Sequence, residues 1–190
     1  MKKLVVASGN KNKVKEIKAL LGDRYEVVSM KEIGLDFDIE ENGETFEENA
    51  YVKAKAVYDV CKSAVVADDS GLLVDALDGE PGVYSARYAG EPCDDRKNNE
   101  KLLAKLKGVT NRSARFVSAV VLYDGVKKLT GYGTVEGTII DEYRGANGFG
   151  YDPLFLVTEL NKTFGETTDE EKNLVSHRAR ALKDLTDKLC

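Results

Sequence analysis

One short loop of this 190-residue sequence has the composition of an anion-binding site. It lies between an apolar run, residues 3–7, and a helical pattern, residues 11–21. Backbone amides at a helix start, a flexible glycine and nearby lysines favour a bound phosphate group, although the G-x-x-x-x-G-K-[ST] pattern does not occur. A plain strand-to-helix turn with solvated lysines explains the same residues equally well. The loop consists of Ser8, Gly9, Asn10, Lys11, Asn12 and Lys13.

A second group of residues is acidic. Asp68, Asp69 and Ser70 directly follow an apolar run, residues 64–67, which we predict to be a strand ending before them, where α/β sheets bind ligands. Glu40 and Glu41 could converge on the same edge. Mg²⁺ takes one or two carboxylates with phosphate oxygens and water, and a carboxylate beside it could deprotonate a water. A solvated acidic loop is the better interpretation for the two glutamates alone, whereas a functional role is favoured for the two aspartates.

The third group is the glycine-rich segment of residues 145–153. Two aromatic side chains, Phe149 and Tyr151, stand beside Gly150 and before Asp152. A ring among glycines could stack on a flat nucleobase, because glycines permit close approach. Aromatic side chains that fill the core beneath a loop would give the same pattern.

The fourth group lies in the last helical pattern, which predicts one helix over residues 169–189. Lys172 and the only histidine, His177, would point about 140° apart on a regular helix, so both reach one ligand only if Lys172 lies in a frayed first turn or loop. His177 and Arg178 offer donors to a carbonyl edge or an anion, although a lone histidine is usually structural. A Ser–His–Asp hydrolase built on Ser8 or Ser70 is disfavoured, because Ser70 lacks the G-x-S-x-G elbow.

The elements around these groups indicate an α/β fold. Strand-like runs at residues 3–7 and 25–29 flank the helical pattern of residues 11–21, which is typical of a βαβ unit. An Asp-Gly pair between two later strand-like runs predicts a hairpin. The further predicted elements cover residues 45–61 with a capping box, 94–106, 114–123, 126–136 and 154–157.

Charge and composition exclude several classes of protein. The 28 Lys and Arg residues against 33 Asp and Glu give a net charge of −5, which argues against a broad basic face for nucleic acid. No apolar run approaches the roughly 18 residues of a membrane helix, and the apolar start is too short for a signal peptide. Cys61, Cys93 and Cys190 form no C-x-x-C pair, which suits the cytoplasm rather than a disulfide framework or a thiolate zinc site.

In their order along the chain, these residues resemble the inosine/xanthosine triphosphate pyrophosphatase family, the Ham1-like nucleotidases. The resemblance covers residues 8–178, and the ordered set is far more specific than any single motif. The matching segments are Ser8-Gly9-Asn10-x-x-Lys13, Glu40-x-x-Gly43, Asn49-Ala50-x-x-Lys53-Ala54, Asp68-Asp69-Ser70-Gly71-Leu72, Pro81-Gly82-x-Tyr84-Ser85-Ala86-Arg87, Gly148-Phe149-Gly150-Tyr151-Asp152-Pro153 and Glu171-Lys172-Asn173 with Ser176-His177-Arg178.

The resemblance implies one domain, residues 1–190, with an elongated two-lobed α/β fold around a long mixed sheet and the nucleotide between the lobes. It implies hydrolysis of ITP, dITP and XTP to the monophosphate and pyrophosphate, with Mg²⁺ or alternatively Mn²⁺. It implies a homodimer that cleanses the nucleotide pool. The cysteines, the net charge and the short apolar runs separately predict a cytoplasmic protein that acts on free nucleotides, not on nucleic acid or membranes.

The resemblance also assigns roles to residues. Residues 8–13 and Lys53 would hold the phosphates, with Ser70 beside them. Glu40 and Asp69 would serve the metal, and Asp69 would be the base for the attacking water. The residues that would hold the base are Phe149, by stacking, with Gly150, Tyr151, Asp152, Lys172, His177 and Arg178.

Two other functions stay open at the level of sequence. A Maf-like pyrophosphatase for modified pyrimidine nucleotides would share acids at a strand edge and lysines, but the Gly-Phe-Gly-Tyr-Asp-Pro and Ser-His-Arg segments speak against it. A nucleotide-binding module without turnover would be expected to lack Asp69, which is present.

Overall fold

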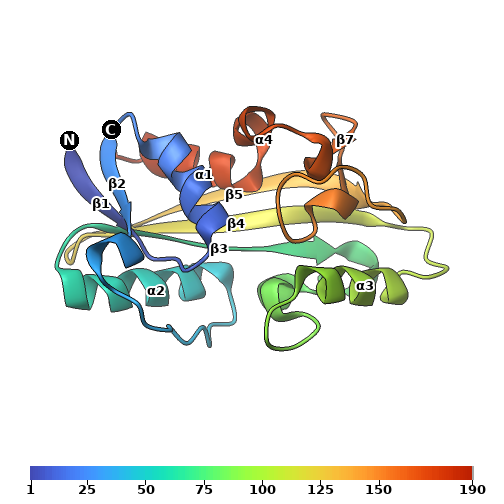
Figure 1. Cartoon of the computed structure of the whole chain (residues 1–190), viewed down its shortest axis with the longest axis horizontal. Coiled ribbons are helices and arrows are strands. Elements are labelled where there is room, and N and C mark those ends of the chain that lie inside the picture. The colour runs from blue at the N-terminus through green and yellow to red at the C-terminus, as the bar shows by residue number, and fades with distance from the viewer. Residues whose placement is uncertain (190) are drawn as a thin grey trace. The chain divides into compact units, whose positions relative to one another are not determined.

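The computed structural model describes residues 1–189, whose strands form one mixed seven-stranded sheet in the order β2-β1-β3-β4-β5-β6-β7 (Figure 1). β1 pairs in parallel with β2 and β3, whereas β6 pairs antiparallel with β5 and β7. The predicted α/β class and mixed sheet are therefore confirmed. The strands are β1 (Lys2–Val6), β2 (Tyr25–Ser29), β3 (Val65–Val74), β4 (Ser113–Tyr123), β5 (Lys128–Ile139), β6 (Phe155–Val157) and β7 (Lys162–Thr163).

Helices flank the sheet, and their termini follow local capping signals. The side chain of Asn10 accepts the backbone N–H groups of Asn12 and Lys13 at the start of the first helix, and Thr45 and Glu48 form a reciprocal capping box at the start of the second. None of the helices in residues 1–189 is long and apolar enough to cross a membrane. The helices are α1 (Lys11–Leu21), α2 (Phe46–Cys61), α3 (Asp95–Lys105), α4 (Asp169–Val175) and α5 (His177–Asp187).

The chain divides into two compact units, and β3, β4 and β5 contribute residues to both. Unit 1 comprises Met1–Asp69, Ser118–Gly133 and the chain from His177 onward. Its sheet is covered on both faces. Leu4, Val66 and Val120 pack with α1 and α5 on one face, and Val5 and Val65 pack with α2 on the other. Figure 1 shows α1 and α2 on these opposite faces. The alternation of strand side chains thus fills two separate apolar layers.

Unit 2 comprises Ser70–Val117 and Thr134–Ser176. Its core contains three phenylalanine rings in mutual contact, Phe116, Phe155 and Phe164, with ring centres 4.6–6.1 Å apart. Tyr151 is part of the same buried cluster. Its hydroxyl donates to the carbonyl of Ser85 at 2.7 Å, so the polar tip of this ring is satisfied inside the protein.

The third strand differs from its prediction. A strand ending at Ala67 was expected, but β3 continues through Asp68, Asp69, Ser70 and Gly71 to Val74. The turn-forming composition of this segment argued for a loop. The sheet overrides it, because β3 lies between β1 and β4 and basic side chains from other elements bind its two carboxylates.

The last helix also differs. The predicted single helix over residues 169–189 is broken at Ser176, whose ψ of 155° is extended. α4 therefore ends in unit 2, and α5 begins in unit 1 with His177. The angle of about 140° between Lys172 and His177 holds only for one regular helix, so it does not apply to this chain. Leu174, an apolar residue of the predicted helix, is 81% exposed.

A glycine in β5 lets α5 approach the sheet closely. A Cβ atom on Gly133 would lie 2.0 Å from the carbonyl oxygen of His177 and 2.4 Å from the amide nitrogen of Ala181. Since real side chains never come that near to backbone atoms, glycine at this position fixes where α5 starts.

Candidate functional site

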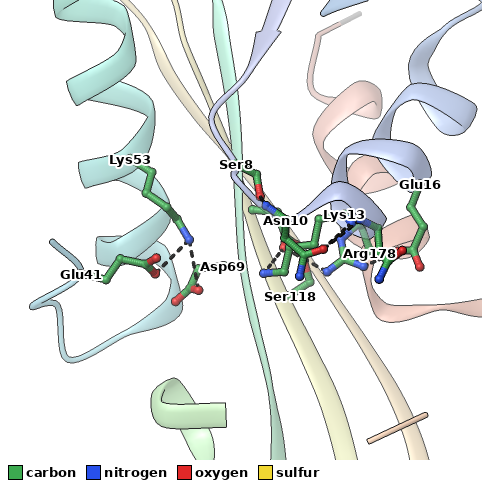
Figure 2. Close-up of polar contacts among 11 residues, drawn as sticks. Ser8, Asn10, Lys13, Glu16, Glu41, Lys53, Asp69, Ser118 and Arg178 are labelled. Carbon is green, nitrogen blue, oxygen red and sulfur yellow. Dashed lines mark hydrogen bonds and ion pairs between the residues drawn. The ribbon is translucent and has the colours of Figure 1, made fainter. Parts of the chain in front are cut away.

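Two neighbouring carboxylates of β3 point to opposite faces of the sheet. Side chains along a strand alternate, and Val66 packs with α1 and α5, whereas Val65 and Ala67 pack with α2. Asp68 accordingly meets residues of α1 and α5. Asp69 meets Lys53 of α2, as Figure 2 shows. One short stretch of strand therefore serves two separate polar groups in unit 1.

The first polar group is centred on Asp68, whose side chain is fully buried. Oδ2 of Asp68 lies 2.8 Å from Nζ of Lys13 and 3.0 Å from a terminal nitrogen of Arg178. Oδ1 accepts the hydroxyl of Ser118 at 2.5 Å. Burial opposes ionisation of this carboxyl, but Arg178, Lys13 and Ser118 outweigh it and hold the pKa of Asp68 well below its ordinary value. Asp68 is therefore a buried carboxylate anion.

Arg178 completes this group. Its other terminal nitrogen donates to Oε2 of Glu16, a buried residue of α1. Burial alone would lower the pKa of Arg178, but Asp68 and Glu16 reverse the effect and raise it. An arginine held between two carboxylates and 1% exposed is rigidly placed. The group thus links α1, β3 and α5.

The second polar group surrounds Asp69. Nζ of Lys53, from α2, lies 3.3 Å from Oδ1 of Asp69 and 2.9 Å from Oε2 of Glu41. Burial would lower the pKa of Lys53, but Asp69 and Glu41 raise it above its ordinary value. Burial raises the pKa of Asp69, because Lys53 and Lys13 offset the loss of solvation only in part. Asp69 is thus a carboxylate that holds a proton more readily than an exposed aspartate.

The predicted anion loop precedes α1 and is ordered by its own side chains. The hydroxyl of Ser8 accepts the N–H of Asn10 at 3.1 Å, and Oδ1 of Asn10 accepts the N–H of Asn12 at 2.9 Å. The first turn of α1 contains no acidic residue and carries Lys11 and Lys13 instead. Two lysines beside the positive end of a helix dipole suit a bound anion.

The glycine-rich segment forms a separate polar group in unit 2. Oδ2 of Asp152 accepts the N–H of Phe149 at 2.8 Å and lies 2.7 Å from Nζ of Lys172. The same ammonium lies 4.6 Å from the centre of the Phe149 ring. Gly148 has a φ of +74°, and a Cβ there would lie 2.1 Å from Oδ2 of Asp152. Glycine is therefore required for the loop to close on this carboxylate.

A cavity lies beside this loop in unit 2. It has a volume of about 510 Å³, and its lining includes Phe149, Gly150, Asp95, Asn99 and Tyr143. The N–H of Gly150 donates to Asp95 at 2.8 Å, and its carbonyl accepts from Asn99 at 3.0 Å. Both contacts tie the loop to α3.

The structure therefore sorts the predicted site residues into groups. Lys13 and Arg178 share the Asp68 carboxylate, Lys53 binds Asp69, and Lys172 binds Asp152. Tyr151 lies in the core of unit 2, which matches the alternative of an aromatic that fills the interior, and its contact with a base stays a prediction. His177 is the first residue of α5 and is 5% exposed.

Three residues of these groups, Glu41, Glu16 and Ser118, had no assigned site role, although Glu41 was expected near the edge that carries the aspartates. Glu40 is exposed and, within residues 1–189, makes no hydrogen bond or ion pair, whereas its neighbour Glu41 binds Lys53. Glu16 and Ser118 also join the Asp68 group. Ser118 carried a detectable signal, since it is a polar residue in the apolar run of β4, but Glu16 resembles any charged residue on a solvated helix.

Comparison with known proteins identifies the family. The sequence model of the Ham1 family matches residues 4–188. The chain belongs to the Ham1 family. It is 53% identical over 190 residues to the dITP/XTP pyrophosphatase of Bacillus subtilis (strain 168), with 98% of this chain and 96% of that protein covered. It is 50% identical over 199 residues to the dITP/XTP pyrophosphatase of Clostridium perfringens (strain 13 / Type A), with 100% and 98% covered.

Solved structures of Ham1 proteins share the fold. The Ham1 protein of Staphylococcus aureus superposes with a TM-score of 0.88 at 46% identity, covering 99% of this chain and 98% of that one. The Ham1 protein of Coxiella burnetii superposes with a TM-score of 0.89 at 39% identity, covering 100% and 98%. The sheet and helices described above are thus those of Ham1 proteins.

The acidic residues of this Ham1 chain fit a divalent cation. Within residues 1–189, Oδ2 of Asp69 is buried without a hydrogen-bond partner, which is costly for a carboxylate oxygen unless another group binds it. No group of three or more Asp, Glu, His or Cys side chains in those residues could enclose a metal alone. Mg²⁺ does not need such a group of three side chains, because it commonly binds one or two carboxylates and completes its coordination shell with water and phosphate oxygens.

Proposed function

We propose that the protein hydrolyses the non-standard purine nucleoside triphosphates ITP, dITP and XTP to the monophosphate and pyrophosphate, and so cleanses the nucleotide pool. One observation carries this proposal. This chain is similar over its whole length to two dITP/XTP pyrophosphatases, and it has a buried Asp69 carboxylate beside Lys53. Oδ2 of that carboxylate has no hydrogen-bond partner within residues 1–189 and can bind a ligand.

Basic residues of unit 1 bind the triphosphate. Lys13 lies in the first turn of α1, where the backbone amides and the helix dipole also favour anions. Lys53 adds a second ammonium beside Asp69. The loop residues Ser8, Gly9, Asn10, Lys11 and Asn12 surround the same helix start, and Ser70 follows Asp69 in β3. Positive groups at fixed positions stabilise the charge that grows on the leaving pyrophosphate.

Asp69 accepts a proton from the attacking water. The water oxygen forms a bond to the α-phosphorus, the bond from that phosphorus to the bridging oxygen breaks, and pyrophosphate leaves with the bonding electrons. A raised pKa suits this task, because a general base works best when its pKa approaches the working pH.

Asp69 together with Glu40 or Glu41 would hold Mg²⁺, with Mn²⁺ as the alternative ion. Bound there, the ion would polarise phosphate oxygens and offset their charge. Glu41 is the better placed of the two glutamates, because it shares Lys53 with Asp69, whereas Glu40 is exposed.

We assign recognition of the base to two sets of residues. Phe149 offers a ring for stacking, flanked by Gly150 and Tyr151 and held by Asp152 and Lys172. His177 and Arg178 donate hydrogen bonds to the six-carbonyl of hypoxanthine or xanthine. The amino group of adenine would leave these donors unpaired, which is a large penalty in a buried site.

By its resemblance to the family, we also propose that the protein is a cytoplasmic homodimer that acts on free nucleotides rather than on nucleic acid or membranes. Sedimentation velocity over a range of concentrations tests the dimer. A monomer at all concentrations would remove that part of the proposal.

A substrate panel tests the proposed activity. Pyrophosphate release is measured with ITP, dITP, XTP, GTP, ATP and modified pyrimidine triphosphates, each without metal, with Mg²⁺ and with Mn²⁺. We expect the highest kcat/KM for ITP, dITP and XTP with Mg²⁺. If ITP and XTP were no better than GTP, the proposal fails, and a preference for modified pyrimidines would favour a Maf-like activity instead.

A further inference from the structure

A buried hydroxyl in β4 contacts the Asp68 group. Ser118 is fully buried, and on its face of the sheet the next residues are Val120 and Leu122, which pack in the apolar layer with α1 and α5. A hydroxyl in such a layer destabilises the protein unless it is hydrogen-bonded. Oγ of Ser118 donates to Oδ1 of Asp68 at 2.5 Å, a charge-assisted hydrogen bond.

The two oxygens of Asp68 have different partners. Oδ1 accepts a hydrogen bond from the hydroxyl of Ser118. Oδ2 lies within 3.0 Å of Nζ of Lys13 and of a terminal nitrogen of Arg178. A carboxylate that rotated about its Cβ–Cγ bond would move Oδ2 away from both cations. The hydroxyl on Oδ1 opposes that rotation, so it controls the position of two cations that it does not touch.

We propose that Ser118 is a positioning residue for the phosphate site: through Asp68, it keeps the ammonium of Lys13 oriented before substrate arrives. This inference rests on the proposed function, in which Lys13 binds phosphate. A side chain already held in place loses less conformational freedom on binding, so affinity for the triphosphate is higher. Ser118 itself does not contact the substrate.

The test compares three variants by steady-state kinetics with ITP and Mg²⁺. Ser118→Ala removes the donor, and we expect the KM to rise about tenfold, on the scale of one hydrogen bond to a charged group. We expect kcat to change less than about threefold, because Asp69 lies on the opposite face of the sheet. Ser118→Cys keeps a weak donor of similar size, so its KM should fall between those of the wild type and Ser118→Ala.

Val120→Ala is the matched control. Val120 is equally buried, lies two residues after Ser118 in β4 and faces the same apolar layer, but its side chain has no polar atom. It should lose stability and keep the wild-type KM. If Val120→Ala raised the KM as much as Ser118→Ala, or if Ser118→Ala kept the wild-type KM, Ser118 would have only a structural role and the inference would be wrong.

A binding experiment separates this inference from the proposed function. Inorganic tripolyphosphate in metal-free buffer is titrated into each protein by calorimetry, which reports the phosphate site without turnover. Weaker binding by Ser118→Ala, but not by Val120→Ala, supports the inference, and equal binding by all variants overturns it. A wild type that hydrolyses none of the triphosphates overturns the proposed function, whereas the tripolyphosphate comparison still decides whether Ser118 orients Lys13.

Discussion

Lys172 and Asp152 form a buried ion pair in unit 2, with 2.7 Å between Nζ and Oδ2 and only 4% of each side chain exposed. Removing one partner leaves a buried charge uncompensated. We expect Lys172→Met to lower the free energy of unfolding by about 3–5 kcal/mol, measured by urea denaturation.

Two variants check the origin of that loss. Lys172→Met with Asp152→Asn removes both charges and keeps an acceptor for the N–H of Phe149, so it should regain part of the stability. Lys162→Met breaks an exposed pair with Glu171, which water screens, and should lower the free energy of unfolding far less than Lys172→Met. A loss as large in Lys162→Met would show that charge removal in general, not burial, is responsible.

Asp69→Asn should abolish turnover far more than it weakens nucleotide binding. The amide cannot accept a proton from water, so we expect kcat to fall by about 10²–10⁴-fold, the usual contribution of a general base. In the wild type, kcat should fall on acidification, because protonation of a carboxyl with a raised pKa removes the base at a higher pH than for an ordinary aspartate. Near-normal turnover by Asp69→Asn would remove Asp69 from its proposed role.

Phe149→Ala should act mainly on KM. Loss of one stacking ring is worth about 1–3 kcal/mol per base, so we expect the KM for ITP to rise about tenfold or more while kcat stays within a few-fold. Tyr84→Ala removes an exposed ring elsewhere in unit 2 and serves as the control. Unchanged steady-state constants in Phe149→Ala would count against stacking.

Gly133→Ala should destabilise the protein by about 1–3 kcal/mol, the usual range for overpacking, because the added Cβ must displace the backbone at the start of α5. Gly9→Ala is the control for stability and should change it much less, because a Cβ on Gly9 would have no atom within 4 Å. Thermal unfolding of the two variants measures the difference. Equal midpoints would show that α5 moves without cost.

Glu47 should make stability depend on pH in the acidic range. Hydrogen bonds from Lys128 and Tyr132, opposed by burial and aided by Thr130, lower the pKa of Glu47 from 4.5 to about 2. A lowered pKa stabilises the fold above the ordinary value, and the contribution is lost as pH falls through the folded-state value. The gap in urea midpoint between the wild type and Glu47→Gln should therefore be widest above about pH 5 and close toward pH 2. A gap that stayed constant from neutral pH to pH 2 would contradict the lowered pKa of Glu47.

Elements with their own start and stop signals could be predicted from sequence. α1 and α2 have the predicted bounds, because Asn10 and the Thr45–Glu48 box cap them locally. The break at Ser176 has only a weak signal, because no proline or glycine marks it and a serine occurs inside helices as well as before a helix start. There, tertiary packing decides where one helix ends and the next begins.

Motifs in the sequence name single residues of the candidate site, but they do not show which of these residues contact one another. Lys53, Asp69 and Phe149 belong to motifs. The partners of Asp68 come from residues 13, 118 and 178, so no window of sequence contains them. Local composition misled the prediction of β3, because the turn-forming residues after Ala67 argued for a loop.

The alternation of side chains in β3 also limits how this gene can change length. Inserting or deleting a single residue of β3 before Asp68 would turn each of the two aspartates to the opposite face of the sheet. Asp68 would then face the side of Lys53, and Asp69 would face the side of Arg178. Inserting or deleting two residues would return each aspartate to its original face of the sheet. Insertions of two residues in this strand should therefore be tolerated better than insertions of one residue. A library of insertion variants would show this difference in the fraction that folds.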